Sequence, residues 1–267
     1  MTADEKLSLA RFLDLATDAI RYGYRSEERE YQFSDDPAQA AVLPATTAPT
    51  AAQPAAPPFP DGDSLEQIAA EVRACTACSL CETRTNAAPG EGAQQPLVMV
   101  IGEGPGADED AAGRPFVGKA GQLLDKMLAS IELSRNSNSF IANVVKCRPP
   151  NNRDPLPEET AACIPFLERQ IQILKPQFIL CAGRIAAQTL LKTGEPVGKL
   201  RGTFKTLRIG DRDIPLLVTY HPSALLRNEE FKRPAWEDLK TLRAAIADQA
   251  AIADQAAIAD ISAPGEN

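Results

Sequence analysis

Histidine, tryptophan and long apolar runs are scarce in this sequence of 267 residues. It holds one His and one Trp, and aromatic residues make up 5% of the chain. No apolar run approaches the roughly 18 residues that a membrane-spanning helix requires. Three acids, Asp4, Glu5 and Asp14, interrupt the first apolar residues, which does not suit a secretory signal. We therefore expect a soluble, cytoplasmic protein, and its single histidine, His221, is a candidate for catalysis.

A surplus of basic residues is also missing, because the formal net charge is -8. Such a charge at first argues against a nucleic-acid partner. The acids, however, are concentrated at the two ends of the chain. Residues 1–63 carry 5 bases and 11 acids, and residues 248–267 carry 4 acids and no base, which leaves 23 bases and 21 acids for residues 64–247. A nearly neutral middle region can still bind phosphates through a local basic patch.

The composition divides the chain into four segments. Residues 1–34 begin with apolar residues at helical spacing and predict an amphipathic helix, which docks either on the core or on a partner protein. Residues 35–63 are rich in Ala, Pro and Thr and predict a disordered linker. Residues 64–247 predict the folded domain. Residues 248–267 continue a six-residue AAIADQ repeat, which we interpret as a solvated helical tail.

Strand and helix patterns alternate along residues 64–247. Five segments have the short apolar pattern of strands, the last two flanking a turn typical of a hairpin: 97–101, 140–145, 178–181, 204–209 and 214–219. Five more have amphipathic or capping signals of helices: 64–73, 120–131, 157–174, 184–192 and 236–246. This alternation predicts an α/β fold, a three-layer α/β/α sandwich around a mostly parallel sheet.

The carboxyl ends of the expected strands carry the residues that we consider for chemistry. Residues 97–101 end in Gly102-Glu-Gly-Pro-Gly106, and ligands of open α/β sheets bind beyond such strand ends. Alone, this stretch fits an ordinary turn equally well. Asn143 stands near the end of the next strand and His221 follows the last one. With Phe116, which is either a stacking face for a base or a core residue, Glu103 and these two residues could converge on one pocket.

A near match to a phosphate-binding loop occurs at Gly113-Arg-Pro-Phe-Val-Gly118-Lys119. The next residue is Ala120, so the hydroxyl that would hold magnesium is absent, and the preceding residues 108–112 are acidic and not strand-like. A nucleotide hydrolase is therefore a weak hypothesis.

The six cysteines favour a metal or cluster site over a disulfide framework, because nothing in the sequence suggests secretion. Cys75, Cys78 and Cys81 are spaced by two residues each, and Cys147 and Cys163 follow later. A close pair and two later cysteines can hold one zinc or one iron–sulfur cluster, and the spacing leaves both the metal and the role of Cys81 open. Cys181 lies in an apolar strand and is expected to be a small buried hydrophobe.

Four motifs together resemble those of the family 4 uracil-DNA glycosylases, the iron–sulfur branch of that superfamily. They are Gly102-Glu-Gly-Pro-Gly106, Gly113-Arg-Pro-Phe-Val-Gly118, Asn143-Val-Val-Lys-Cys-Arg-Pro-Pro150 and His221-Pro-Ser-Ala-Leu-Leu-Arg227. The resemblance covers about residues 64–246. It implies a parallel four-stranded sheet and a [4Fe-4S] cluster on Cys75, Cys78, Cys147 and Cys163, without a nucleotide cofactor or added divalent metal. Relatives that bind uracil covalently carry a glutamine where this chain has Gly104 and a basic loop that is missing here, which favours a turnover enzyme.

The resemblance also implies the reaction and the role of each residue. Uracil is flipped out of single- or double-stranded DNA and its glycosidic bond is hydrolysed, which starts base excision repair. Glu103 orients the water or stabilises the sugar cation, and His221 stabilises the departing uracil. The implied substrate contacts are Phe116 for stacking, Asn143 for the base edge, Gly104, Gly106 and Glu109 around the base, Leu225 as a wedge in the base stack and Arg227 on phosphate. Lys146, Arg148 and Arg201 are further candidates for phosphate contacts.

For partners, we expect uracil-containing DNA, no membrane, a monomeric state and a protein partner for the N-terminal helix. Two alternatives stay open: a non-catalytic protein that binds damaged DNA, and a polymerase-associated protein whose core serves as a platform.

Overall fold

The computed structural model describes residues 62–262, and the side-chain surroundings of residues 62–251. The expected helix in residues 1–34 lies outside the described residues, as does nearly all of the expected linker at 35–63. No helix among the described residues is long and apolar enough to cross a membrane.

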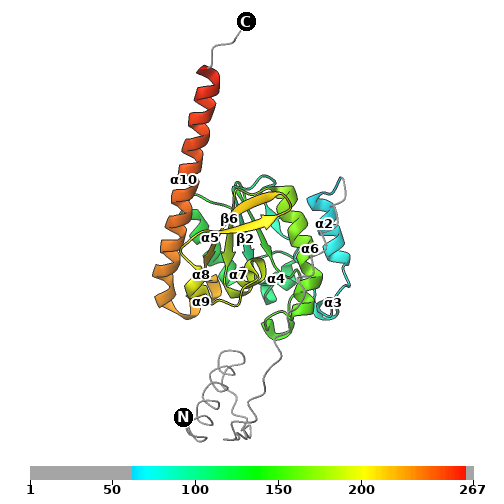
Figure 1. Ribbon diagram of the computed structural model, residues 1–267. Helices are drawn as coiled ribbons and strands as arrows, with labels where there is room; N and C mark the ends of the chain where they lie inside the picture. Colours follow the sequence, from blue (N-terminus) through cyan, green and yellow to red (C-terminus); the bar gives the residue numbers. More distant parts are fainter. Residues whose placement is uncertain (1–61, 263–267) are drawn as a thin grey trace, which may run out of the picture. The chain divides into compact units, whose positions relative to one another are not determined.

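A sheet forms the centre of the fold (Figure 1). It has six strands, in the order β1-β3-β2-β4-β6-β5. The four middle strands run parallel: β3 (Ser139–Asn143), β2 (Val98–Gly102), β4 (Phe178–Ala182) and β6 (Arg212–Thr219). The short strands β1 (Glu91–Gly92) and β5 (Lys205–Ile209) pair antiparallel at the two edges. The predicted four-stranded parallel sheet is therefore present, extended by one antiparallel strand at each edge.

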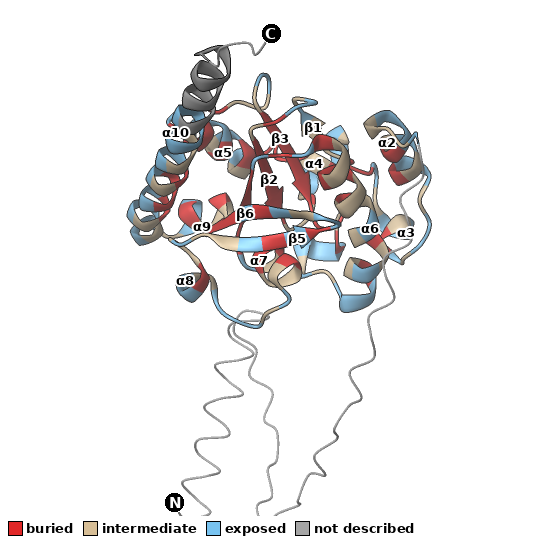
Figure 2. Cartoon of the chain, turned by 45° about the horizontal axis from the view of Figure 1, so that its top comes forward, coloured by how far each residue is buried: buried red, intermediate tan, exposed pale blue. Residues whose placement is uncertain are grey.

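Helices cover both faces of the sheet, which confirms the predicted three-layer sandwich (Figure 2). One face packs against α2 (Leu65–Ala74), α6 (Pro157–Leu174) and α7 (Arg184–Leu191), and the other against α5 (Lys119–Ala129), α9 (Pro222–Arg227) and α10 (Lys232–Ser262). The shorter elements are α3 (Leu80–Thr83), α4 (Ala107–Ala112), η2 (Pro150–Asn152), α8 (Val197–Leu200) and η3 (Glu229–Phe231).

Strand β2 shows why a continuous apolar run is needed at the centre. All five of its residues are buried, and successive side chains point to opposite faces. Met99 and Ile101 pack into the core beneath α6 and α7, whereas Val98 and Val100 pack into the core beneath α5 and α10. With both faces covered, the side chains of the strand cannot alternate between apolar and polar.

The ends of three elements can be compared with the sequence-based expectation: one agrees with it and two differ. The hydroxyl of Ser64 accepts the backbone N–H of Gln67 at 3.1 Å and begins α2 as predicted. Strand β3 ends at Asn143, two residues early, and Val144 and Val145 form a bend whose N–H groups donate to the carbonyls of Gly102 and Glu103. Helix α10 starts before residue 236 and continues to Ser262, since Pro234 is tolerated in a first turn and the alanine-rich repeat favours helix.

Candidate active site

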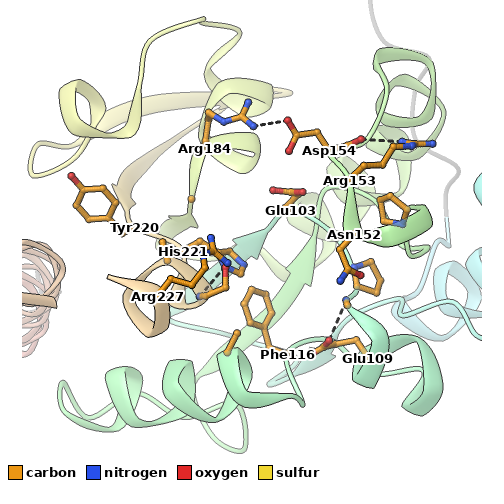
Figure 3. A pocket seen from close by; sticks show the side chains of 18 of the residues that line it. Glu103, Glu109, Phe116, Asn152, Arg153, Asp154, Arg184, Tyr220, His221 and Arg227 are labelled. Carbon is orange, nitrogen blue, oxygen red and sulfur yellow. Dashed lines mark hydrogen bonds and ion pairs between the residues drawn. The ribbon is translucent and has the colours of Figure 1, made fainter. Parts of the chain in front are cut away.

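A cavity of about 530 Å³ opens at the carboxyl edge of the parallel sheet, where the predicted site residues meet (Figure 3). Seven of the nine residues that the sequence assigned to catalysis or substrate line it: Glu103, Gly104, Gly106, Glu109, Phe116, His221 and Arg227. Figure 3 shows Glu103 facing Phe116 and His221 across the cavity. The other two, Asn143 and Leu225, do not line it and are treated below.

The turn that carries Glu103 is fastened to the end of the neighbouring strand. The backbone N–H groups of Val144 and Val145 donate to the carbonyls of Gly102 and Glu103 at 2.9 and 3.0 Å. A side chain at Gly104 would place its Cβ 2.8 Å from Cγ2 of Val145. In this chain the glycine thus lets the turn lie close against the Val145 side chain at the end of β3.

The environment of Glu103 favours its protonated form. Burial, followed by the nearby Asp154 carboxylate, raises the pKa of Glu103 to about 7, and Arg184 opposes this shift. Asp154 and Arg184 themselves form an ion pair of 2.6 Å that lines the same cavity. Near neutral pH, Glu103 is thus poised between its acid and its carboxylate, as is useful for a group that handles a proton or water.

Phe116 is held in an unusual backbone conformation beside the histidine. Its φ of 53° lies in the left-handed region, and its ring centroid is 5.4 Å from that of His221. Arg135 fixes this loop by donating to the carbonyls of Pro115 and Phe116 at 3.0 and 2.7 Å. A Cβ at Gly102 would lie 2.5 Å from the Phe116 ring, so the glycine provides room for the aromatic side chain.

His221 caps α9 and its hydrogen bonds fix its tautomer. Nδ1 accepts the backbone N–H of Ser223 at 3.1 Å and lies 2.8 Å from the Ser223 hydroxyl. A neutral ring whose Nδ1 is an acceptor carries its proton on Nε2. Burial, and secondarily Arg227, lower the pKa of His221 to about 4. The ring is therefore neutral at physiological pH and has an N–H to donate.

Glu109 braces the loop that resembles a phosphate-binding motif. Its Oε1 accepts the N–H groups of Val117 and Gly118 at 2.8 and 2.9 Å, and Oε2 accepts that of Gly106 at 3.1 Å. The backbone donors that a phosphate would need are thus already bound to a carboxylate. The loop also follows helix α4 and not a strand, which argues further against nucleotide hydrolysis.

Asn143 ends β3 next to Gly102 and is not among the residues that line the cavity. Its side chain is 1% exposed, and neither the amide nitrogen nor the oxygen has a hydrogen-bond partner within the described part of the chain. A Cβ on Gly102 would come 2.5 Å from both Asn143 Oδ1 and the Phe116 ring, so the amide and the ring lie side by side. An unpaired buried amide is costly and indicates a missing partner with one donor and one acceptor.

The structure contradicts the hypothesis that Leu225 is a wedge in the base stack, because a wedge has to be exposed. It is 3% exposed and packs in the core beneath α10, because its position on α9 faces the sheet. The adjacent Leu226 is 52% exposed instead. Of the suggested phosphate contacts, Lys146 is excluded because it is 1% exposed, and Arg201 pairs with the buried Asp238 at 2.8 Å.

Sequence reasoning missed several other residues that line the cavity, among them Asn152, Arg153, Asp154, Arg184 and Tyr220. One signal was available for Arg184, which follows β4 directly after Gly183, at the same sheet edge that singled out Glu103. Asp154 comes from the loop between η2 and α6, and no pattern within that loop points to the cavity. Arg135 was also missed, since its role appears only when α5 and the Phe116 loop are folded together.

The cysteines form a second site, in a small hollow next to α6. Cys75, Cys78, Cys81, Cys147 and Cys163 all line it. Donors reach three sulfurs: the N–H of Ala77 to Cys75 at 3.5 Å, Arg84 to Cys147 at 3.0 Å and the N–H of Lys146 to Cys163 at 3.2 Å. Among the described residues, no group of three His, Cys, Asp or Glu side chains is gathered as a site for a single metal ion. Cys181 is fully buried in β4 and apart from this hollow, as expected for a small hydrophobe.

Comparison with known proteins gives a consistent family. The family described as the uracil DNA glycosylase superfamily matches residues 89–240. A Type-4 uracil-DNA glycosylase of Sulfurisphaera tokodaii is 45% identical over 185 residues, which cover 68% of this chain and 84% of that protein. Type-4 uracil-DNA glycosylases of Thermotoga maritima and Archaeoglobus fulgidus are 44% and 39% identical, over 68% and 67% of this chain and 94% and 92% of their own lengths.

Proposed function

Because the chain belongs to the uracil DNA glycosylase superfamily, we propose that its cavity binds a uracil flipped out of DNA and hydrolyses the N-glycosidic bond. Water adds to the sugar carbon, the bond to the base nitrogen breaks, and the products are free uracil and an abasic site. One observation carries this proposal most directly. The buried Asn143 amide has neither its donor nor its acceptor paired and lies beside the Phe116 ring, as recognition of a planar base requires.

In this proposal, recognition depends on stacking and on the base edge. The ring of Phe116 stacks on uracil, and the Asn143 amide pairs with one donor and one acceptor of its Watson–Crick edge. Gly104 and Gly106 keep the backbone open next to the base, and Glu109 holds Gly106 and the Phe116 loop in place. Flipping costs a few kcal/mol, which these contacts have to offset.

Catalysis then requires groups that stabilise opposite charges. As the bond breaks, positive charge develops on the sugar and negative charge on the base. The Nε2–H of neutral His221 donates to the oxygen on which the negative charge accumulates, an effect commonly worth about 2.7–4 kcal/mol per donor. Glu103 in its carboxylate form orients the attacking water and stabilises the sugar cation. Arg227, exposed on the cavity rim, contacts a DNA phosphate.

We also propose that Cys75, Cys78, Cys147 and Cys163 hold a [4Fe-4S] cluster. The donor set fits this group, since the soft sulfurs of these cysteines line one hollow and N–H groups point at three of them. The bound cluster would tie the segment after α2 to α6 and to the loop after β3. Burial raises the pKa of Cys163 to about 11, so loading must displace protons from the thiols.

The cluster has a test that is independent of activity. Purified protein should be brown, absorb near about 400 nm and contain roughly four irons per chain. Colourless protein with one zinc per chain would contradict the assignment.

The enzymatic proposal is tested by incubating the protein with oligonucleotides that contain a single uracil, in EDTA and without nucleotide. We expect free uracil and an abasic site from both single-stranded and duplex substrates, and no release from a thymine control. Binding to uracil DNA without base release would instead favour a damaged-DNA binder. Magnesium-dependent phosphate release from ATP would favour a nucleotide hydrolase.

For the organisation of the whole chain, we propose that residues 64–247 act as a monomeric, cytoplasmic catalytic domain. Residues 1–34 would contact a protein partner, and the linker at 35–63 would join them to the catalytic domain. Residues 248–267 would serve as a solvated tail. Co-purification of partners with the full chain, and their loss without residues 1–34, would test the first of these assignments.

A further inference from the structure

A fully buried lysine lies between Asn143, beside the cavity, and the cysteine site. Lys146 is 1% exposed and is directly followed by Cys147. Lysine is almost never buried to this extent unless its ammonium is bound, because removing the charge from water is costly. The active-site account above gives Lys146 no role, and its burial excludes a contact with DNA.

The contacts of Lys146 connect two elements that carry different functions. Its Nζ donates to the backbone carbonyl of Asn143 at 2.9 Å and to Oε1 of Gln170 at 2.7 Å. Gln170 is buried on α6, the helix that also carries Cys163, and its Nε2 donates to the carbonyl of Pro89 at 2.8 Å. The ammonium thus joins the end of β3 to α6.

The backbone of Lys146 strengthens the same connection. Its N–H donates to Sγ of Cys163 at 3.2 Å, and its carbonyl accepts the N–H of Ala88 at 2.8 Å. Lys146 therefore has hydrogen bonds both to a residue of the cysteine site, Cys163, and to Asn143 beside the cavity. A change in the packing of α6 near Cys163 would reach Asn143 through this residue.

Among the described residues, packing and the main chain, rather than hydrogen bonds of its own, position the Asn143 amide. Its side-chain nitrogen and oxygen have no hydrogen-bond partner in the described part of the chain, so neighbouring side chains do not orient them through hydrogen bonds. The amide is instead placed by the packing around it, including the Phe116 ring, and by the main chain of Asn143, whose carbonyl accepts from the Lys146 ammonium. A displacement of about 1 Å at such a point can lower a rate on the order of a hundredfold.

We propose that Lys146 is a positioning residue for uracil recognition, which fixes the Asn143 main chain by tying it to α6 beside the cysteine site. The inference rests on the proposed function, because it assumes that Asn143 reads the base. It assigns no contact between Lys146 and the substrate.

The test is a double-mutant cycle measured on uracil excision. Lys146→Met keeps the length of the side chain and removes its donors. We expect kcat/KM to fall about 10- to 100-fold in Lys146→Met. The Asn143→Ala variant should also have a lower kcat/KM than wild type. In the Asn143→Ala background, the additional effect of Lys146→Met should be less than about threefold, because the residue acts through Asn143. Lys126→Met, on the exposed side of α5, is the matched control and should behave like wild type.

Iron content and absorbance near about 400 nm are measured on each variant, so that loss of the cysteine site is recognised. Gln170→Met cuts the same connection and leaves Lys146 and all cysteines in place. If Lys146→Met loses iron, the cycle is run with Gln170→Met and the same non-additivity is expected.

Two results would overturn the inference alone: an active Lys146→Met enzyme with the kcat/KM of wild type, or full additivity with Asn143→Ala. A wild-type protein without uracil release, or an Asn143→Ala variant as active as wild type, would instead refute the proposed function and this inference with it.

Discussion

Two ionisable side chains in the cavity have their pKa values shifted in opposite directions. Burial beside Asp154 raises the pKa of Glu103 to about 7, whereas burial near Arg227 lowers the pKa of His221 to about 4. Environments that separate two titratable groups in this way often mark the parts that they play in a reaction. Here the histidine is kept neutral as a donor, and the glutamate becomes a carboxylate only around neutral pH.

The pH dependence of excision follows from these values. Because the proposed mechanism uses the carboxylate of Glu103, it predicts that single-turnover rates rise as the pH increases through about 7 and then level off. His221 should add no further step between pH 5 and 8, since its pKa of about 4 lies below that range. In Glu103→Gln the rate should be low and the rise near pH 7 should disappear. A Glu103→Gln variant that kept the same rise would assign that ionisation to another group.

For single residues, the sequence could predict where Glu103 and His221 lie in the fold, but not the burial and the charges that surround them. Glu103 and His221 were found because each follows an apolar strand, and parallel strands end at one edge of the sheet. Their pKa shifts depend first on burial in the folded cavity and then on Asp154, Arg184 and Arg227, which approach from three separate segments. The wedge hypothesis for Leu225 failed for a similar reason, because a motif does not say which face of a short helix is buried.

Among the elements, α5 and the loop before it decide where the stacking ring lies. Gly121 is buried on α5, and a Cβ there would stand 1.9 Å from the carbonyl oxygen of Phe116. Phe116 already has a left-handed backbone, so the loop cannot move freely away from the helix. The glycine is thus required by the close approach of loop and helix.

Gly121→Ala should therefore destabilise the protein, although alanine normally favours helix over glycine. We expect a loss on the order of 1–3 kcal/mol in the free energy of unfolding, the usual effect of overpacking, together with a drop of at least about tenfold in kcat/KM. Gly194→Ala serves as the control, since nothing lies within 4 Å of its added Cβ. Thermal unfolding and uracil release report the two effects. Wild-type activity in Gly121→Ala would show that the ring position does not depend on this contact.

The elements themselves were largely predictable, because long periodic segments and short apolar runs carry a strong local signal. The helices α2, α5, α6 and α7 and the hairpin of β5 and β6 fall within two residues of the expected bounds. Strand β1 was missed, since two residues contain no periodicity. The end of β3 was missed because Val144 and Val145 look like strand residues, yet they bind the carbonyls of the Glu103 turn instead.

On the scale of the whole molecule, all site residues lie within the part of the chain that is nearly neutral, while the surplus of acids over bases is confined to its two ends. The cavity is lined by residues from 103 to 227 and the cysteine site by residues from 72 to 166. Negative ends do not favour binding to DNA, which is itself negatively charged. The charge of the full chain is therefore a poor guide to its substrate.

A fragment of residues 62–251 should fold and excise uracil with a kcat/KM within about threefold of the full chain at moderate salt. At low salt the fragment should bind DNA more tightly, because acidic residues have been removed and charge repulsion is weakly screened. Uracil release and DNA affinity at two salt concentrations would measure both effects. A fragment that folds but loses activity would show that the ends of the chain contribute to the site.

The most direct test of the account is the single-turnover rate of uracil release by His221→Ala, measured with the dissociation constant for the same uracil-containing oligonucleotide. The account predicts a rate lowered about 100- to 1,000-fold, as expected for one lost donor to the departing base. It predicts an affinity within about threefold of wild type, because this hydrogen bond strengthens as the bond breaks. Equal rates for His221→Ala and wild type would contradict it.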